Sequence, residues 1–474
     1  MHGHCHADHA AMAGAQTIER LRIYLRELAP PARALLTAEC ERSLLRGEEA
    51  AGIALLLAEL HEIGGDQPPG MDRYVRLFCQ PLEPFLVDDA AAHDHPGRIA
   101  RCSLEMLWTW IRRDLLPVQA RRLEERLAEA LRSGDAAAIA ALTRAFQDKA
   151  AAAIAASLAA AGDDERVRRR TIAQIGTPRA EEDARALQWI LSGRDDLAAL
   201  AARLPLHVAS VSEAAIDEYR ALIEQTCARD ANLFVYALLL VMSRLAAPWQ
   251  IIRFGIQAAG VHTAARIAQT PYGVTVTIVL AELDRMVRAL RADLHRATAA
   301  PVAALLKAIH DTLRGLRIEI DLPMDSTWGR ALAAQRRQVA QLLHANIASA
   351  PARLRRVLDT RVSPHVGADA ARNPREVAEV EALLRLVGDC RPFAGELAIA
   401  EATQQAFHEI QQTLEDRMRA LFDPARHAGV DHGCRRSQID AAARFCTQVF
   451  GERYAARLAK AAAVAGSAEL LRAS

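Results

Sequence analysis

The sequence has few aromatic residues and almost no lysine. Aromatic side chains make up 4% of the 474 residues, and the only lysines are Lys149, Lys307 and Lys460. Aromatic and β-branched residues favour strands, so their scarcity argues against a sheet-rich fold. The abundant residues, above all alanine with leucine, arginine and glutamate, have high helix propensity. This composition predicts an all-α protein.

The chain also lacks a cysteine framework. Its eight cysteines form no CxxC pair and have no regular spacing. In a chain of this size, such cysteines indicate a reducing compartment and not a disulfide scaffold. Half of them lie within apolar helical patterns and are expected to be buried, namely Cys40, Cys79, Cys102 and Cys227.

No apolar run is long enough to span a membrane. The longest, at 233–242, has ten residues, whereas a bilayer span needs about 20. We expect a buried core helix there. The N-terminus shows no basic segment followed by an apolar one, as a signal peptide would. These features predict a soluble, cytoplasmic protein that is not an integral membrane protein.

No large excess of charge is present, since the formal net charge is +1. Nucleic-acid binders usually carry a clustered basic excess, so we expect no nucleic-acid partner. Arginine clusters do occur at 166–170 and 353–356. Each could bind a phosphate or an acidic partner, but a solvated helix face explains them more simply.

The common catalytic signatures are missing as well. There is no Walker A loop, no GxGxxG after a strand, no GxSxG and no HExxH, and no histidine has a glutamate three residues before it. These absences remove the usual signs of phosphate binding, serine hydrolysis and di-iron carboxylate chemistry. We therefore predict no cofactor and favour a non-enzymatic function, with enzyme status left open.

What is present is helical periodicity. Two stripes recur at spacings of three and four residues, as expected for helices packed lengthwise on other helices. They comprise Val276, Leu280, Leu283, Val287, Leu290 and Leu294, and then Phe407, Ile410, Leu414, Met418 and Leu421. No repeat of fixed period is visible. We predict an irregular multi-helix array or stacked helical bundles.

Turn-rich stretches divide the array. We expect a disordered histidine-rich tail at 1–14, an N-terminal helical region at 15–205, a central apolar core at 206–362 and a C-terminal helical region at 363–474. Caps are predicted at Asp135, at Asp195, and at Ser210 with Glu213.

One segment breaks the helical pattern. Residues 316–322, LRIEIDL, alternate strictly between apolar and polar residues. Alternation with a period of two is typical of a strand. We expect at most one minor β segment there.

Two groups of residues are candidate metal ligands, because imidazole and thiolate bind zinc, copper and nickel. The first lies in the N-terminal tail and the second in a loop near the C-terminus, with Cys446 as a possible fourth ligand. The candidates are His2, His4, His6 and His9 around Cys5, and His427, His432 and Cys434. A divalent metal is therefore possible, although a mobile tail and a polar surface loop are the simpler interpretations.

His-Asp pairs suggest one enzymatic alternative. They occur at His93-Asp94-His95 and at His310-Asp311. The segment AHDHPG resembles a fragment of the signature of cyclic-nucleotide phosphodiesterases, which are all-helical metal-dependent phosphohydrolases of the HD type. The resemblance implies a metal-activated water. The upstream histidine motif of that family is missing here, which puts the metal site in doubt. His310 and Asp311 are the candidate catalytic residues.

Three functions follow from the sequence. The first is a protein-interaction or scaffold module with protein partners, since helical arrays offer apolar grooves. The second is a metal-dependent hydrolase of the HD-like all-α type. The third is a metal-handling protein that uses the N-terminal histidines. The specific role and the oligomeric state are not determined by the sequence.

Overall fold

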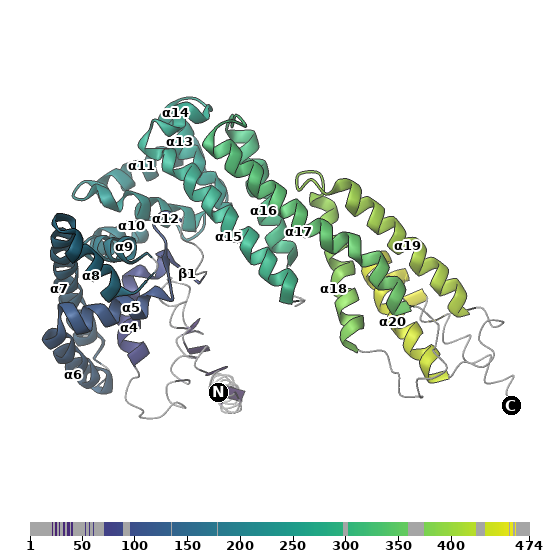
Figure 1. Cartoon of the computed structure of the whole chain (residues 1–474), viewed down its shortest axis with the longest axis horizontal. Helices are drawn as coiled ribbons and strands as arrows, with labels where there is room; N and C mark the ends of the chain where they lie inside the picture. Colours follow the sequence, from purple (N-terminus) through teal and green to yellow (C-terminus); the bar gives the residue numbers. More distant parts are fainter. Residues whose placement is uncertain are drawn as a thin grey trace, which may run out of the picture. The chain divides into compact units, whose positions relative to one another are not determined.

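The computed structural model describes residues 71–88, 95–133, 135–177, 179–296, 302–358, 374–422 and 432–454, with isolated positions between 21 and 60 and at 456, 457 and 460. Nearly all of these residues are helical (Figure 1), which confirms the all-α prediction. The chain forms two compact units. Unit 1 comprises residues 1–207 and 217–244, and unit 2 comprises residues 208–216 and 245–474.

Unit 1 contains most of the shorter helices. Its elements in chain order are α4 (Met71–Cys79), η1 (Gln80–Phe85), β1 (Leu86–Val87), β2 (Ile99–Ala100), α5 (Ser103–Trp110), η2 (Ile111–Leu115), α6 (Pro117–Ser133), α7 (Ala136–Asp163), α8 (Glu165–Ile175), α9 (Ala180–Ser192), α10 (Arg194–Arg203), most of α11 (Glu213–Cys227), η3 (Ala231–Leu233) and α12 (Phe234–Arg244).

The core of unit 1 gathers aromatic side chains that are scarce elsewhere. The ring of Phe78 lies 5.0 Å from that of Trp108 and 5.6 Å from that of Phe146. Trp110 is also fully buried. Each large ring buries much apolar surface, so these aromatic residues contribute a large share of the hydrophobic stabilisation of unit 1. The long apolar run is a buried core helix, as predicted, because all residues from 236 to 242 of α12 are buried.

Unit 2 contains the long helices. Its elements are η4 (Pro248–Ile251), α13 (Ile252–Ala259), α14 (Ala264–Ala268), η5 (Pro271–Gly273), α15 (Val274–Arg296), α16 (Val302–Glu319), α17 (Thr327–Leu358), α18 (Pro374–Cys390), η6 (Arg391–Phe393), α19 (Ala400–Phe422) and α20 (His432–Phe450). In Figure 1, α15, α16 and α17 run side by side, and α17 continues past them to α18 and α19.

The predicted helical stripes form the core of unit 2. In α15, the seam from Val276 to Leu290 is buried, and in α19 so are Ile410, Leu414 and Met418. Both stripes belong to the buried surface that α17 shares. The helix α17 has 32 residues and carries a buried proline, Pro351, within it.

At 316–322, where at most one minor β segment was expected, the chain is mostly helical. Residues up to Glu319 belong to α16, and Asp321 makes an isolated bridge with Thr263. The segment is helical because it continues a stripe of buried apolar residues spaced alternately three and four apart. The stripe comprises Leu306, Ile309, Leu313, Leu316 and Ile320. Among the described residues, the sheet is instead the parallel pair β1–β2, in which Leu86 faces Ile99 and Val87 faces Ala100.

Helix caps were predicted with mixed success. Asp135 caps α7, since its carboxylate accepts a hydrogen bond from the amide of Ala138 at 2.9 Å. Asp195 is no cap, because α10 begins one residue earlier. The cap of α11 is Ser212 and not Ser210: the Ser212 hydroxyl accepts from the amide of Ala215 at 3.3 Å.

Within the described residues, none of the helices is both long and apolar enough to cross a bilayer. The division into four sequence regions stays a prediction, and part of it, including the tail at 1–14, lies outside the described residues.

Candidate functional site

His310 and Asp311, the candidate catalytic pair, form a local ion-pair cluster on α16. The Nδ1 atom of His310 lies 2.9 Å from one carboxylate oxygen of Asp311, and the ammonium of Lys307 donates to the other at 2.5 Å. Burial acts to raise the pKa of Asp311, but the hydrogen bonds from Lys307 and His310 outweigh it and lower that pKa. The His310 ring packs against Phe393, with 5.0 Å between centroids.

This pair gathers no further ligands. Nowhere in the described part of the chain do three or more histidine, cysteine or acidic side chains come together in a way that could hold a metal ion. Of the other His-Asp pair, only His95 is described, and it is buried at the turn before β2. The hydrolase alternative therefore gains no support from these residues.

The remaining metal candidates are not tested by the structure. Most lie outside the described residues, and for two of them only the backbone position at the start of α20 is described. The first group comprises His2, His4, His6, His9 and His427, and the second His432 and Cys434. Cys446 is fully buried, and burial raises its pKa to about 12. A thiol held in the protonated form by an apolar environment is unreactive.

The other described cysteines are free thiols. Cys40 and Cys79 are buried as expected, but Cys227 is half-buried and Cys102 is exposed. Cys102 departs from the prediction because it lies between β2 and the first turn of α5, outside any apolar stripe. Burial raises the pKa of Cys390 to about 12 and that of Cys227 to about 11.

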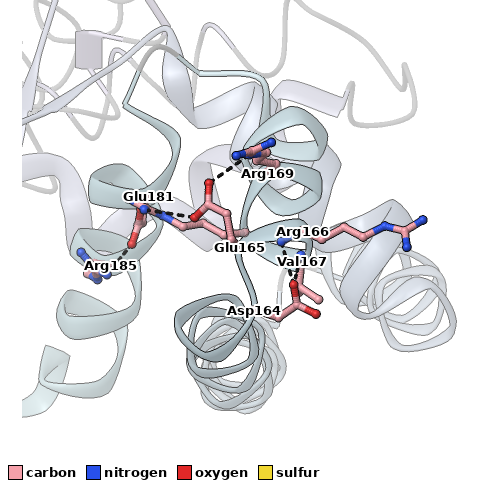
Figure 2. A network of polar contacts seen from close by, with 8 residues as sticks. Asp164, Glu165, Arg166, Val167, Arg169, Glu181 and Arg185 are labelled. Carbon is pink, nitrogen blue, oxygen red and sulfur yellow. Dashed lines mark hydrogen bonds and ion pairs between the residues drawn. The ribbon is translucent and has the colours of Figure 1, made fainter.

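The arginine cluster at 166–170 is a solvated helix face with partners of its own (Figure 2). The carboxylate of Glu181 accepts from Arg168 at 2.9 Å and from Arg185 at 2.5 Å, and Glu165 accepts from Arg169 at 3.0 Å. Such exposed pairs contribute little stability. Acids on α8 and α9 thus pair with Arg168 and Arg169, two of the arginines of this cluster.

Two cavities stand out instead, and neither was predicted. The first is a groove of about 630 Å³ in unit 2, between the C-terminal end of α16, the first turns of α17 and the segment before α19. Its floor is apolar and is formed by Leu313, Ile320, Leu332, Ala333 and Ala340. A groove of this size with apolar walls and a few polar groups is typical of a binding site.

Arginines line the edge of this groove. The guanidinium of Arg317 binds both carboxylate oxygens of Glu396, at 3.2 and 2.8 Å, and Arg336 donates to the Glu396 carbonyl oxygen at 3.0 Å. Arg337 is exposed and makes no ion pair with another described residue. Three arginines and two acids, Glu396 and Asp321, thus line the groove.

Exposed apolar side chains accompany the arginines. Met324 lines the groove and is 68% exposed, and Ile318, the residue after Arg317 on α16, is 61% exposed. Large apolar side chains left in water near an apolar groove mark a surface that another molecule can cover. Ile318 also explains the strand-like sequence pattern of this segment, because it is an exposed isoleucine between the buried Leu316 and Ile320.

The groove contains a strained backbone position as well. Ala398 has φ = 57°, and within the described residues every other positive φ belongs to a glycine. A side chain in this left-handed conformation costs about 1–2 kcal/mol. Ala398 also lines a smaller, neighbouring cavity of about 450 Å³ between α17 and α19, beside His344. Strain of this kind is often found where a chain binds something.

The second main cavity lies in unit 1 and measures about 620 Å³. It is an open pocket lined by η1, α7 and α10, and it reaches Leu240 of α12. Its walls are mostly apolar, with Thr143, Arg144, Arg194 and Asp195 among the polar groups. No sequence pattern predicted this cavity, because the segments that line it are far apart in the chain.

No protein-family model matches the chain, and no curated protein or solved structure shows significant similarity to it. Its function is therefore argued from its own residues.

Proposed function

We propose that the chain is a protein-interaction module whose unit 2 groove binds an amphipathic helix of a partner protein, with acidic residues along the edges of that helix. The observation that carries this proposal is the placement of exposed Met324 at an apolar groove lined by arginines. Ile318 and the strained Ala398 support it.

The apolar part of the groove provides the affinity. Fully burying a methionine or isoleucine side chain is worth about 1.5–3 kcal/mol. A helix that places apolar residues three and four positions apart would cover the floor and would also bury Met324. Methionine suits this role because its flexible, polarisable side chain adapts to different partners.

The arginines give the partner its charge. Arg336 and Arg317 are fixed by Glu396, whereas Arg337 is exposed to solvent. A carboxylate from a partner would pair with Arg337 in two parallel hydrogen bonds. An acidic helix therefore fits this groove better than a basic or neutral one.

Site-specific photo-crosslinking tests the proposal. A photoreactive amino acid at Met324 captures partners in cells of the source organism, and mass spectrometry identifies the crosslinked segment. The same group at Val118, an apolar residue of unit 1 that is 57% exposed, is the matched control. Recurrent capture of acidic amphipathic helices at position 324 alone supports the proposal. A basic or non-helical segment, or equal capture at both positions, contradicts it.

Variants then test the captured segment as a synthetic peptide. Met324→Asp should weaken its binding by tenfold or more, on the order expected for a central interface residue. Val118→Asp, an identical change on unit 1, should leave binding unchanged. Arg337→Glu should weaken binding mainly at low salt, because exposed charge pairs are screened.

A reducing compartment and a cytoplasmic location remain predictions. The free thiols among the described cysteines support them.

A further inference from the structure

The cavity of unit 1 differs from the groove of unit 2 because it contains buried polar atoms without partners. Thr143 on α7 lines the cavity and is 7% exposed, yet its hydroxyl makes no hydrogen bond with any described group. A buried hydroxyl without a partner costs about 1–3 kcal/mol. The structure therefore contains a polar group at this cavity whose hydrogen bonding is incomplete.

Two other buried threonines in the helices of this chain are satisfied, whereas the hydroxyl of Thr403 on α19, like that of Thr143, has no partner among the described groups. The hydroxyl of Thr226 donates to the Leu222 carbonyl oxygen at 2.8 Å, and that of Thr312 donates to the Ala308 carbonyl oxygen at 2.8 Å. Both bonds reach the residue four positions earlier, which is the usual partner of a helical threonine. Thr143 makes no such bond, and its hydroxyl has no partner among the described groups.

Arg194 provides a second unused donor at the same cavity. Its side chain is 11% exposed, and its Nη1 donates to Asp148 at 2.6 Å and to the Leu191 carbonyl oxygen at 3.0 Å. Its Nε has no hydrogen-bond acceptor, although Asp195 lies 3.7 Å away. Arg144 at the edge pairs with Asp195 at 2.9 Å. Two arginines and one aspartate thus line the cavity.

The walls are apolar. They are formed mainly by Leu77, Pro81, Phe85, Ile139, Leu197 and Leu240. The volume of about 620 Å³ lies within the range of about 300–1,000 Å³ that small-molecule sites occupy. Apolar walls bind a hydrocarbon chain, and hydrogen-bond donors without acceptors bind an anionic oxygen.

We propose that this cavity binds a small molecule with a hydrocarbon chain and a terminal carboxylate, of the fatty-acid type. The chain lies against the apolar walls, and the carboxylate accepts hydrogen bonds from the Thr143 hydroxyl and the Arg194 guanidinium. This site is separate from the proposed protein-binding groove, since all its residues belong to unit 1.

Isothermal titration of the purified full-length protein with three probes tests the headgroup. Dodecanoate, dodecan-1-ol and dodecyltrimethylammonium carry the same chain with an anionic, a neutral and a cationic end. We expect dodecanoate to bind at one site per chain about tenfold or more tighter than the alcohol, and the cation not to bind. Equal binding of all three, or binding of none below their micelle concentrations, overturns the proposal.

Two alanines of α10 provide a matched pair of variants for the location. Ala198 and Ala199 are both exposed, but only Ala198 lines the cavity. We expect Ala198→Trp to fill the cavity and abolish dodecanoate binding, and Ala199→Trp to keep the affinity within about twofold. If both variants bind equally well, the ligand lies elsewhere and the assignment is wrong.

Thr143→Val tests the hydroxyl without changing the shape of the side chain. We expect dodecanoate to bind about tenfold more weakly and the affinity for dodecan-1-ol to stay unchanged. Thr226→Val, which removes a hydroxyl that already has a partner, should leave binding unchanged, and thermal melts verify that both variants fold. Undiminished dodecanoate binding by Thr143→Val removes the assigned role of the hydroxyl.

Discussion

The cavity of unit 1 and the groove of unit 2 are alike in size, but they differ in which of their groups lack partners. In unit 1, the cavity contains buried polar atoms without acceptors, at Thr143 and Arg194. In unit 2, the groove's main ion pair is complete, and apolar side chains at Met324 and Ile318 are exposed to water.

This difference indicates different ligands. A buried donor without a partner is satisfied by a small molecule that brings one acceptor within hydrogen-bond distance. Exposed apolar side chains are satisfied only by a surface broad enough to cover them, such as a helix of another protein. The following predictions test whether the two sites are independent and what each depends on, from the largest expected effect to the smallest.

Gly315→Ala should lower the stability of unit 2 and leave that of unit 1 unchanged. A Cβ atom at Gly315 would lie 2.5 Å from the indole of Trp249, and overpacking of this kind costs about 1–3 kcal/mol. We expect hydrogen exchange, followed by mass spectrometry, to speed up in unit 2 and to stay unchanged in unit 1, with dodecanoate binding retained.

The control for this variant is Gly388→Ala on α18, where an added Cβ meets no atom within 4 Å. This substitution should raise the free energy of unfolding by about 0.5–1 kcal/mol, because alanine loses less backbone entropy than glycine on folding. Faster exchange in both units of Gly315→Ala would show that the two cavities belong to one cooperative structure, and the comparison would fail.

Asp183→Asn tests the contribution of buried polar groups to unit 1. Burial raises the pKa of Asp183, partly opposed by a hydrogen bond from Ser103. The folded form therefore holds the proton more tightly than the unfolded chain does. The stability from this group is complete below the ordinary aspartate pKa and is lost as the pH rises through the raised value.

We expect Asp183→Asn to flatten this pH dependence and to stabilise unit 1 at neutral pH by on the order of 1 kcal/mol, since no charge is then buried. Guanidinium denaturation at a series of pH values measures the slope. The control is Asp163→Asn at the exposed end of α7. A steeper slope in Asp183→Asn would show that the buried carboxylate stabilises the fold through its charge.

Ala398→Gly tests the strain at the groove. Glycine adopts φ = 57° without the steric cost that alanine pays there, so the substitution should stabilise unit 2 by about 0.5–1 kcal/mol. Ala402→Gly, within α19, should instead cost about 1 kcal/mol. Thermal denaturation of both variants compares them, and equal destabilisation would rule out strain at Ala398.

Arg169→Gln should have the smallest effect. Its ion pair with Glu165 is exposed on both sides, so we expect the Tm to change by less than about 2 °C and the change to vanish in high salt. Dodecanoate binding should stay the same. A marked loss of that binding would connect the arginine face of α8 to the cavity of unit 1.

Much of the fold was predictable because helical stripes depend on local spacing. The seam from Val276 to Leu290 and the buried run at 236–242 follow from which residues are apolar and how far apart they lie. The strand-like pattern at 316–322 has the same origin. Ile318 is apolar but exposed, so the apolar–polar alternation there does not separate buried from exposed residues.

The sites themselves were beyond such reasoning. The cavity of unit 1 is assembled from η1, α7, α10 and α12, and no local pattern records that these segments meet. The missing partner of Thr143 and the positive φ of Ala398 are properties of the packed chain. The histidine and cysteine motifs that drew attention in the sequence either remain apart, as His310 does, or lie outside the described residues.

Pro351 has a consequence for how unit 2 loosens. A proline has no amide hydrogen, so position 351 of α17 donates no bond to the carbonyl of Ile347. Fraying that starts at Leu358 therefore meets a gap in the hydrogen-bond ladder about two turns into the helix. The turns after this gap are therefore held mainly by the buried side chains of Leu354, Val357 and Leu358, and less by the hydrogen-bond ladder that supports residues 329–340 at the groove wall.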